Sequence, residues 1–549
     1  MSPHLLFKAA VLAAMFVTAL PAQTSSFEKR FEAIRSRPEY RHSRFGVEFY
    51  SIEDGKVLYA WNPQELFVPG STTKLLSLGS ALELLGPDFR FHTRVYRTGP
   101  LKDGTLEGDL ILLASGDPDL SNRIQPDGTM VFENEDHSYD GFAESKPVPG
   151  DPLTVIRELA SKVTSSGIHR VTGRVAVDIS LFPEGTRELG TRVVISPIVV
   201  NDNVVDVMVT PGAREGDPAA LEISPKTTYV NITNQVKTAA VGSKMHLEWA
   251  NDTSNPDGTH NVSLSGAIPS GAPPKLRVYK VPTPSRFAEV VFTEALESAG
   301  VQIGGGANAA AHATDKLLYT RENEVAEHVS PPLKEEAKIT LKVSQNLHAS
   351  MMPYIVGAYL QKESPQPLQA GFDHERAMLQ QAGLDLTGAV QNDGAGGAAL
   401  FAPDFIVQFL LHITKQPFFQ DFKTALPILG KDGSLFNIET DSPAAGHVFA
   451  KTGTMGGGNA LAPGGGVIEG KGLADFIETK DGRHLAFAAY INFVSFATMN
   501  ESATRMVGEA LGEVSAAAYD GFRSDRGTPD RPKPDRLKPD RLKPDRLKQ

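Results

Sequence analysis

The chain has 549 residues, which is enough for two or three domains with their own cores. Its net charge of -11 at pH 7 argues against general nucleic-acid binding, so we expect no nucleic acid among its partners. The absence of cysteine excludes disulfides, cysteine-ligated zinc and a cysteine nucleophile.

The first residues have the pattern of an export signal. Lys8 precedes an apolar run over residues 9–20, and Pro21-Ala22 supplies a small-residue cleavage context. Because the run is too short to span a membrane comfortably, we predict a signal peptide over residues 1–22. An N-terminal core helix is the alternative. The mature chain is then expected in the periplasm or outside the cell, with attachment to the wall or membrane left open.

The next segment predicts two strands and a helix. Residues 44–51 and 56–61 alternate like strands around the hairpin signal Glu53-Asp54-Gly55. A helix is predicted from Ser71 because its leucines recur on one face until Gly86-Pro87 ends it: Leu75, Leu78, Leu82 and Leu85.

The rest of the chain divides by composition. Residues 98–325 contain many short strand-like runs with Gly and Pro turns and are predicted to be β-rich. They separate residues 27–97 from residues 326–522, where a helical run is predicted over 341–360. The tail, residues 523–549, repeats Pro-Asp-Arg and is predicted to be disordered.

Two patterns that resemble ligand sites are rejected. Residues 465–472 have the spacing Gly-x4-Gly-Lys but lack the Ser or Thr that holds magnesium, so a flexible loop is predicted. Residues 117–121 begin like a calcium loop, but Asn122 replaces the required glycine. The histidines show no paired ligand spacing. We therefore predict no metal and no cofactor.

A serine and a lysine lie three residues apart where the predicted helix begins. Residues i and i+3 share a helix face, so the Lys74 amine can reach the Ser71 hydroxyl. Serine needs a base, and lysine can be that base only if burial or a nearby positive charge lowers its pKa from about 10.4. The pattern alone is weak because Ser26 and Lys29 repeat it, and a simple helix cap is the alternative for Ser71.

Two further motifs follow along the chain. Ser344-Gln345-Asn346 begins a helical run, and Lys451-Thr452-Gly453-Thr454 lies in a strand-like segment. Ser-x-x-Lys, a Ser-x-Asn triplet and Lys-Thr-Gly are the set found in penicillin-binding proteins and class A β-lactamases. Singly, the serine could be a cap and the lysine a surface residue, but the ordered set is far more specific.

With these motifs, the chain resembles the class C low-molecular-mass penicillin-binding proteins, the D-alanyl-D-alanine carboxypeptidase/endopeptidases of peptidase family S13. The resemblance runs from about Arg44 to Ala518. The long gap between Ser71 and Ser344 matches the extra domains of that family and fits a compact class A β-lactamase badly. Further segments share the likeness, namely residues 106–120, 171–182, 199–212, 330–333, 426–435 and 449–461.

The resemblance implies an α+β fold and an enzyme. A serine β-lactamase/transpeptidase-like domain, with an antiparallel sheet flanked by helices, is expected from residues 27–97 and 326–522, with β-rich domains inserted over 98–325. The implied function is a serine D-Ala-D-Ala carboxypeptidase, with endopeptidase activity open, acting on peptidoglycan stem peptides and acylated by β-lactams. A β-lactamase or esterase on the same scaffold and a non-catalytic cell-wall-binding protein are the alternatives. The oligomeric state stays open.

The same resemblance assigns roles to the motif residues. Ser71 attacks the carbonyl of the penultimate D-Ala, Lys74 is its general base, and Ser344 relays the proton to the leaving amine. Asn346 orients Lys74 and the substrate amide. The N–H groups of Ser71 and Thr454 form the oxyanion hole.

Substrate-binding roles are implied as well. Lys451, with Thr452, Gly453 and Thr454, binds the terminal carboxylate and keeps Lys74 partly neutral by repulsion. Asp178 matches an aspartate of the inserted part that is thought to meet the free amine of the substrate, although an ordinary turn residue is the alternative.

One segment departs from the family pattern. Relatives commonly have Asp-Gly-Ser-Gly-Leu-Ser-Arg where this chain has Asp-Gly-Ala-Gly-Gly-Ala-Ala, residues 393–399. The leucine and arginine help relatives to hold a diaminopimelate side chain. Gly397 and Ala399 cannot do so, and the identity of the third stem-peptide residue is left open.

Overall fold

The structure is a computed structural model that describes residues 25–142, 145–305 and 319–522. The predicted signal peptide and the predicted tail lie outside the described residues. Within those residues, no helix combines the length and the apolar composition needed to cross a membrane.

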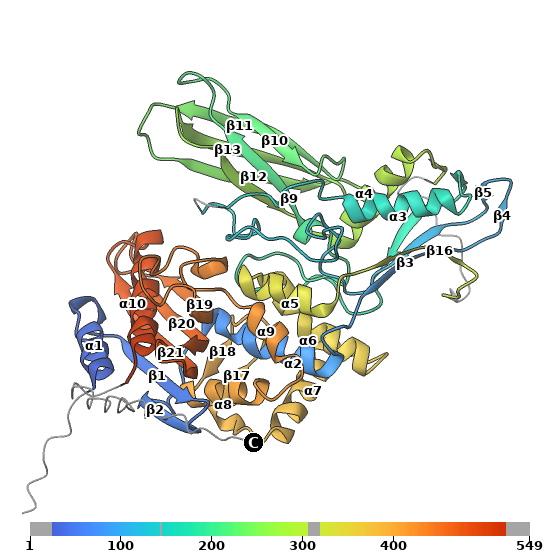
Figure 1. Cartoon of the computed structure of the whole chain (residues 1–549). Coiled ribbons are helices and arrows are strands. Elements are labelled where there is room, and N and C mark those ends of the chain that lie inside the picture. The colour runs from blue at the N-terminus through green and yellow to red at the C-terminus, as the bar shows by residue number, and fades with distance from the viewer. Residues whose placement is uncertain (1–24, 143–144, 306–318, 523–549) are drawn as a thin grey trace, which may run out of the picture.

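A five-stranded antiparallel sheet joins the first and the last segments of the described chain (Figure 1). Its strand order is β19-β20-β21-β1-β2. The predicted hairpin of β1 and β2 is confirmed, and β1 also pairs with β21, from Arg44 opposite Asn492 to Ser51 opposite Leu485. The strands are β1 (Arg44–Ser51), β2 (Lys56–Trp61), β19 (Val448–Gly458), β20 (Gly466–Glu478) and β21 (His484–Phe496).

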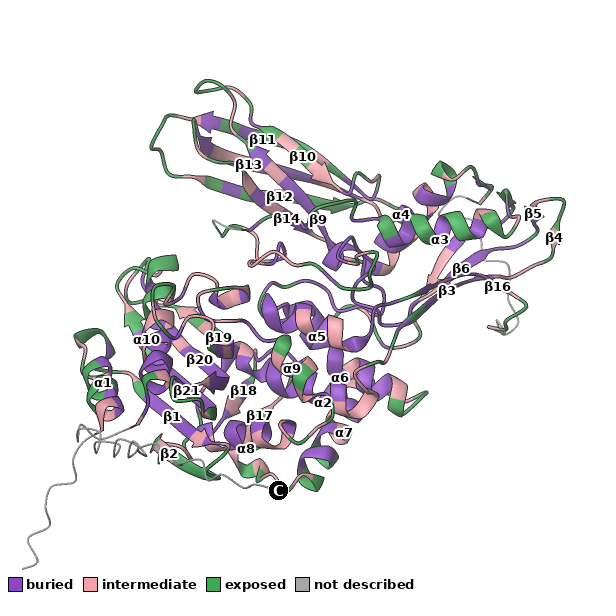
Figure 2. Cartoon of the chain, viewed as in Figure 1, coloured by how far each residue is buried: buried purple, intermediate pink, exposed green. Residues whose placement is uncertain are grey.

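Both faces of this sheet are covered. Along β21, Phe487, Ala489 and Ile491 pack into one core with α1 (Ser26–Arg35) and α10 (Glu501–Asp520), whereas alternate residues point into a second core on the opposite face. A strand buried on both faces has the nearly continuous apolar sequence seen here. Figure 2 shows the inner helices α2 (Lys74–Leu85) and α6 (Asn346–Leu360) mostly buried, while α1 keeps an exposed side.

The second core lies among the helices on the other face of the sheet. The short helix η2 (Gly70–Thr73) leads directly into α2. The helical run predicted over 341–360 is confirmed as α6 from Asn346 onward, whereas residues 341–342 end the preceding helix and the chain turns at Ser344, whose φ is +64°. The remaining elements here are α5 (Leu333–Lys342), α7 (Pro367–Gln381), η4 (Leu386–Gly388), β17 (Ala389–Gln391), β18 (Ala399–Phe401), α8 (Pro403–Ile413), α9 (Phe419–Thr424) and η5 (Gly433–Leu435); η1 (Pro38–Tyr40) precedes β1.

The inserted part is rich in strands, as expected. Strand β3 (His92–Arg97) pairs with β16 (Glu324–Val329), so the chain enters and leaves this part through neighbouring strands, and the inserted part extends a few residues beyond the predicted 98–325 at each end. The sheets have the orders β16-β3-β6-β8, β10-β9-β14, β11-β13-β12 and β15-β7-β5-β4. The elements are β3 (His92–Arg97), β4 (Leu101–Lys102), β5 (Thr105–Leu106), β6 (Leu110–Leu113), α3 (Thr154–Ser165), β7 (Arg170–Val171), β8 (Val175–Asp178), η3 (Asn201–Asn203), β9 (Val204–Thr210), β10 (Ala220–Ser224), β11 (Val230–Ala239), β12 (His246–Ser254), β13 (His260–Pro269), β14 (Lys275–Lys280), α4 (Pro284–Ser298), β15 (Gln302–Ile303) and β16 (Glu324–Val329).

The glycine-rich segment 465–472 is not a flexible loop, and that prediction is wrong. From Gly466 onward it belongs to β20, which pairs with β19 on one side and β21 on the other. A Cβ on Gly470 would lie 2.3 Å from the carbonyl oxygen of Val68. The glycine therefore lets the chain just before Ser71 pack directly on the sheet.

Candidate active site

The turn that carries Ser71 packs against the main chain of β19. Gly70 has a φ of +52°, and a Cβ there would lie 2.5 Å from the backbone nitrogen of Thr454. A Cβ on Gly453 would lie 2.0 Å from the Pro69 oxygen and 3.1 Å from the Ser71 nitrogen. Glycine at both positions brings the Ser71 and Thr454 backbones together, as the oxyanion-hole expectation requires.

Lys74 lies at the centre of the motif residues. Its Nζ forms hydrogen bonds with Ser71 Oγ at 2.6 Å and with Asn346 Oδ1 at 2.6 Å, and lies 3.3 Å from Ser344 Oγ. The structure thus brings together the first two predicted motifs, which are far apart in the sequence. Because Ser71 and Lys74 are three residues apart across η2 and α2, the amine reaches the hydroxyl on the same face.

Burial makes Lys74 a usable base. Its side chain is fully buried, and this desolvation lowers its pKa from 10.5 to about 7, while the negative charges of Glu188 and Asp393 oppose the shift. Burial is the main cause of this low pKa. Repulsion between the Lys74 and Lys451 ammonium groups is mutual, and the expected contribution of Lys451 stays a prediction. About half of the amine is free at pH 7.

The third motif contributes a second buried amine. Burial lowers the pKa of Lys451 well below its usual value, and the positive charges of Lys74 and Lys471 lower it further. Its Nζ donates to the Thr452 carbonyl oxygen at 2.9 Å. The Thr452 hydroxyl lies 2.7 Å from Oγ of Ser434, the middle residue of η5.

Lys471 is a residue of this region that the sequence interpretation missed. It lies on β20 directly opposite Thr454, and its Nζ donates to Thr454 Oγ1 at 2.7 Å. Burial lowers its pKa to about 8. Because Lys471 Nζ donates to the oxygen of the Thr454 hydroxyl, the hydroxyl can donate its own proton to another acceptor. The Lys-Thr-Gly signal alone could not reveal a partner on the neighbouring strand.

The segment that departs from the family pattern borders the same turn. The carboxylate of Asp393 accepts hydrogen bonds from four backbone N–H groups, those of residues 395, 396, 397 and 398. A Cβ on Gly396 would lie 2.0 Å from the Gly70 oxygen, so this tight loop packs on the Ser71 turn.

A strip of the inserted part, residues 188–191, covers this loop and the second motif. Glu188 is buried and accepts from the Gly190 N–H at 2.7 Å and from the Thr191 hydroxyl. A Cβ on Gly190 would lie 2.0 Å from Asn346 Nδ2, and a Cβ on Gly397 would lie 2.4 Å from Leu189 Cδ1. Leu189 therefore fills the space beside Gly397 that a larger side chain would need, and sequence spacing gave no sign of this.

Asp178 makes its hydrogen bonds away from these groups. Its carboxylate accepts from the Tyr319 hydroxyl and from the Ser180 N–H at 2.8 Å. These bonds lower its pKa against the opposing effect of burial, so it is a carboxylate at neutral pH. Its role toward a substrate amine stays a prediction.

Two clusters have the composition of metal sites, although the sequence spacing predicted none. Asp119, Asp202 and His348 form one, and Asp136, His137 and Asp202 form the other; the ligand atoms of each lie within 4.8 Å of one another. The Arg123 guanidinium donates to both Asp136 and Asp202 and thus supplies a positive charge there. We therefore interpret the clusters as one buried ion-pair network.

A serine hydroxyl that is hydrogen-bonded to a buried amine, on a turn packed against the Thr454 backbone, is the arrangement of a serine enzyme of the acyl-transfer class. The fold around it has the antiparallel sheet and covering helices of the serine β-lactamase and transpeptidase group. The D-Ala-D-Ala carboxypeptidase 3 (S13) family model matches residues 28–511, and the chain belongs to this family. The family resemblance and the expected class, a serine-type hydrolase, are confirmed.

Individual relatives agree with this membership. The D-alanyl-D-alanine carboxypeptidase of Actinomadura sp. (strain R39) is 28% identical over 464 residues, which cover 80% of this chain and 78% of the relative. The D-alanyl-D-alanine carboxypeptidase DacB of Haemophilus influenzae is 22% identical over 480 residues, covering 84% and 88%. The crystal structure of penicillin binding protein 4 from H. influenzae has a TM-score of 0.66 at 19% identity and covers 89% of this chain and 98% of that one. It confirms the α+β fold.

Proposed function

We propose that this protein removes the terminal D-Ala from peptidoglycan stem peptides through an acyl-enzyme on Ser71, and that β-lactams acylate the same serine. One observation carries the proposal: the buried Lys74 amine, with a pKa of about 7, lies 2.6 Å from the Ser71 hydroxyl. Family membership supports the reaction. The H. influenzae protein also has a crystal structure in complex with a β-lactam, which supports the inhibitor class.

In the acylation step, the free Lys74 amine takes the Ser71 proton as the serine oxygen attacks the carbonyl carbon of the penultimate D-Ala. The N–H groups of Ser71 and Thr454 stabilise the oxyanion, where one lost donor costs about 10²–10³ in rate. The proton then passes by way of Ser344 to the nitrogen of the leaving D-Ala as the C–N bond breaks. Water attacks the ester in the second half-reaction, with Lys74 again as the base.

The amines around Thr454 suit the terminal carboxylate of the substrate. Lys451 and Lys471 are buried, and burial disfavours both ammonium forms. A bound carboxylate favours the charged forms again, so carboxylate binding and lysine protonation strengthen each other. Thr454 is exposed and Thr452 is partly exposed, so their hydroxyls can reach the substrate.

The third stem-peptide residue would meet different groups from those of relatives. Residues 397 and 399 offer no leucine and no arginine, and Leu189 fills the space next to Gly397. The groups near residues 397 and 399 therefore do not select for a diaminopimelate side chain at the third position of the stem peptide. We propose that the protein acts after export, and the predicted signal peptide and family membership support this.

Labelling with a fluorescent penicillin tests the proposal, with Ser71→Ala as the inactive variant and Ser26→Ala as the matched control. Ser26 belongs to the other Ser-x-x-Lys sequence, in α1, far along the chain from the motifs. Labelling is expected for the wild type and Ser26→Ala and lost in Ser71→Ala. An unlabelled wild type would favour the non-catalytic alternative, and rapid loss of the label would favour a β-lactamase.

Mass analysis of digested muropeptides then distinguishes the reactions. Loss of one D-Ala from the stem peptide demonstrates carboxypeptidase activity. Conversion of cross-linked dimers to monomers demonstrates endopeptidase activity. A labelled protein that leaves muropeptides unchanged contradicts the proposed substrate.

A further inference from the structure

Ser344 has a backbone conformation that is uncommon for a residue other than glycine. Its φ of +64° lies in the left-handed region. The residue lies between the end of α5 at Lys342 and the start of α6 at Asn346. Such a conformation persists only where the surroundings hold it in place. The groups that hold Ser344 therefore decide how its hydroxyl and the Asn346 amide face Lys74.

Direct hydrogen bonds from the inserted part hold this junction. The Tyr139 hydroxyl donates to the Ser344 carbonyl oxygen at 2.6 Å. Gln345 Nε2 donates to Asp136 Oδ1 at 3.0 Å and to Ser138 Oγ at 3.2 Å, while its Oε1 accepts from the Leu347 N–H at 2.7 Å and caps α6. One side chain thus joins the helix start to residues 136–138.

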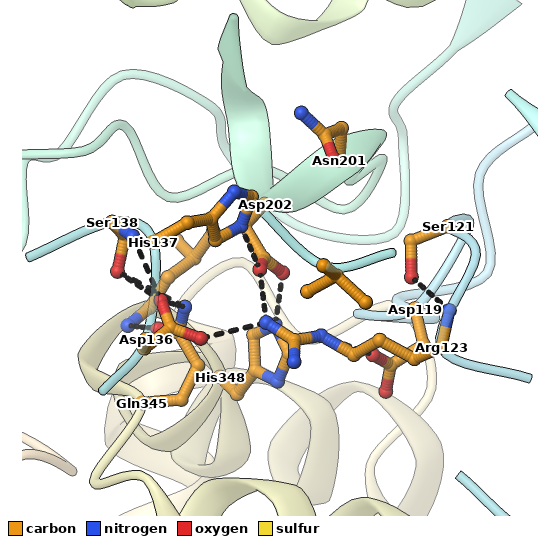
Figure 3. A network of polar contacts seen from close by, with 12 residues as sticks. Asp119, Ser121, Arg123, Asp136, His137, Ser138, Asn201, Asp202, Gln345 and His348 are labelled. Carbon is orange, nitrogen blue, oxygen red and sulfur yellow. Dashed lines mark hydrogen bonds and ion pairs between the residues drawn. The ribbon is translucent and has the colours of Figure 1, made fainter. Parts of the chain in front are cut away.

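Asp136 is itself fixed by the buried ion-pair network (Figure 3). Arg123 Nη2 donates to Asp136 Oδ2 at 2.6 Å and to Asp202 Oδ2 at 2.7 Å, and His137 Nε2 lies 2.6 Å from the same Asp202 oxygen. These side chains are at most 2% exposed. Removing one partner would leave a buried charge uncompensated, so the network resists rearrangement.

The network also reaches the two helices on either side of Ser344. His348, on α6, has Nε2 2.7 Å from Asp202 Oδ1 and Nδ1 3.1 Å from Glu336 Oε1 on α5. One imidazole therefore ties α5, α6 and the inserted part together. Figure 3 shows Gln345 and His348 on the helical side of the network and Asp202 on the side of the inserted part.

The same stretch of the inserted part also contacts the segment that lies beside the third motif. Asn134 Oδ1 accepts from the Gly433 N–H at 2.8 Å. The next residue, Ser434, has its hydroxyl 2.7 Å from Thr452 Oγ1 of the third motif. Residues 123–139 therefore support both the second and the third motif.

We propose that Tyr139, Asp136 and Gln345 are positioning residues that hold Ser344 and Asn346 within reach of Lys74. On this proposal, the inserted part is needed to hold the second motif in its catalytic position. This inference rests on the proposed acyl-transfer function, because it concerns the same Ser71 reaction.

Tyr139→Phe tests the inference, because it removes only the hydroxyl that holds the Ser344 oxygen. Tyr359→Phe is the matched control, since the Tyr359 hydroxyl also donates to a backbone oxygen, that of Ser115, at 2.7 Å. We expect Tyr139→Phe to lower the rate constant of penicillin acylation and kcat about tenfold with KM within twofold. The control should keep wild-type rates with an equal loss in melting temperature. Equal acylation rates in the two variants would mean that Tyr139 has only a structural role.

An exchange of amide and carboxylate provides an independent test. Gln345→Glu places a second carboxylate against Asp136 and is expected to lower acylation at least about tenfold. Asp136→Asn in the same chain removes the repulsion between the two carboxylates and keeps the net charge, but it also takes an acceptor from Arg123 and Ser138, so the double variant should acylate faster than Gln345→Glu without reaching the wild-type rate. If Gln345→Glu acylates at the wild-type rate, or if the double variant is no better than Gln345→Glu, the inference is wrong.

These tests can be separated from a failure of the proposed function. Penicillin acylation needs no stem peptide, so a wild type that is acylated but releases no D-Ala refutes the proposed substrate and still tests the positioning. If the wild type is not acylated, a crystal structure of Tyr139→Phe tests whether Tyr139 positions the second motif. A separation of Asn346 Oδ1 from Lys74 Nζ supports the inference, and a retained distance near the present 2.6 Å overturns it.

Discussion

Replacing Glu188 with glutamine is expected to move the acidic limb of the acylation–pH profile to lower pH. The negative charge of Glu188 opposes the burial that lowers the pKa of Lys74. Glutamine has the same shape, so it can still accept from the Gly190 N–H and can donate to the Thr191 hydroxyl. The substitution therefore removes a charge beside the base with little change in packing.

The size of the effect follows from the pKa of about 7 for Lys74. At pH 6 only about one amine in eleven is free in the wild type. Loss of a neighbouring opposite charge typically moves a pKa by about one unit or more. With a new midpoint near pH 6, about half of the amine is free there, so acylation at pH 6 rises about fivefold. At pH 8 the amine is already mostly free, and the rate stays nearly unchanged.

The assay is the second-order rate constant of penicillin acylation from pH 5 to 9, measured for wild type, Glu188→Gln and Glu184→Gln. Glu184 is a suitable control because it lies in the same stretch of the inserted part and bonds to Ser196 and Ser285 instead. Its variant should keep the wild-type midpoint. A Glu188→Gln profile with an unmoved midpoint, or one moved to higher pH, would refute the reasoning about Lys74.

Three further predictions concern other parts of the structure. Lys471→Met removes the donor to Thr454 Oγ1 and is expected to raise KM about tenfold for peptides with a free terminal carboxylate but not for their C-terminal amides; an equal effect on both would contradict a role in carboxylate binding. Gly397→Leu forces a Cβ to 2.4 Å from Leu189 Cδ1 and 2.6 Å from Leu189 Cβ and should lower the free energy of unfolding by about 1–3 kcal/mol, measured by denaturant titration, with relief when Leu189 is also changed to glycine. Contacts with carboxylates raise the pKa values of His137 and His348 despite burial, so their stabilisation is complete below about pH 6.5 and is lost as the pH rises through the raised values. Melting temperatures from pH 6 to 9 should therefore fall less steeply in His137→Gln than in wild type, and identical slopes would contradict this assignment.

Local patterns predicted those elements whose sequence and tertiary environment agree. Alternation and the Glu53-Asp54-Gly55 turn gave β1 and β2 with the observed bounds. The triplet Ser344-Gln345-Asn346 indicated where a helix begins, but the left-handed turn at Ser344 could not be predicted, because tertiary hydrogen bonds impose it. Gly465–Gly472 was misassigned for a similar reason: pairing on both edges overrides the low strand preference of glycine.

The candidate site shows the same limit. Ser71, Lys74, Ser344 and Asn346 were predicted because their motifs occur together with Lys-Thr-Gly as an ordered set, and the structure places the four together. The neighbours that tune them come from other segments: Lys471, Glu188, Asp393 and the buried ion-pair network. Glu188 and the network have no motif of their own, and the patterns that contain Lys471 and Asp393 did not indicate contact with this site. Such partners depend on strand register and on the docking of the inserted part, which a single sequence does not specify.

The placement of β1 in the large sheet affects how this protein can fold during synthesis. Strand β1 has β2 on one edge, but its other edge needs β21, almost the whole chain later. Closing so long a loop comes at a high entropic cost, which slows folding. A nascent chain can complete the inserted β-rich sheets first, whereas the Ser71 turn acquires its packing partners on β19 and β20 only after the last strands emerge. Truncations that remove β21 should therefore abolish acylation even when every motif residue is still present.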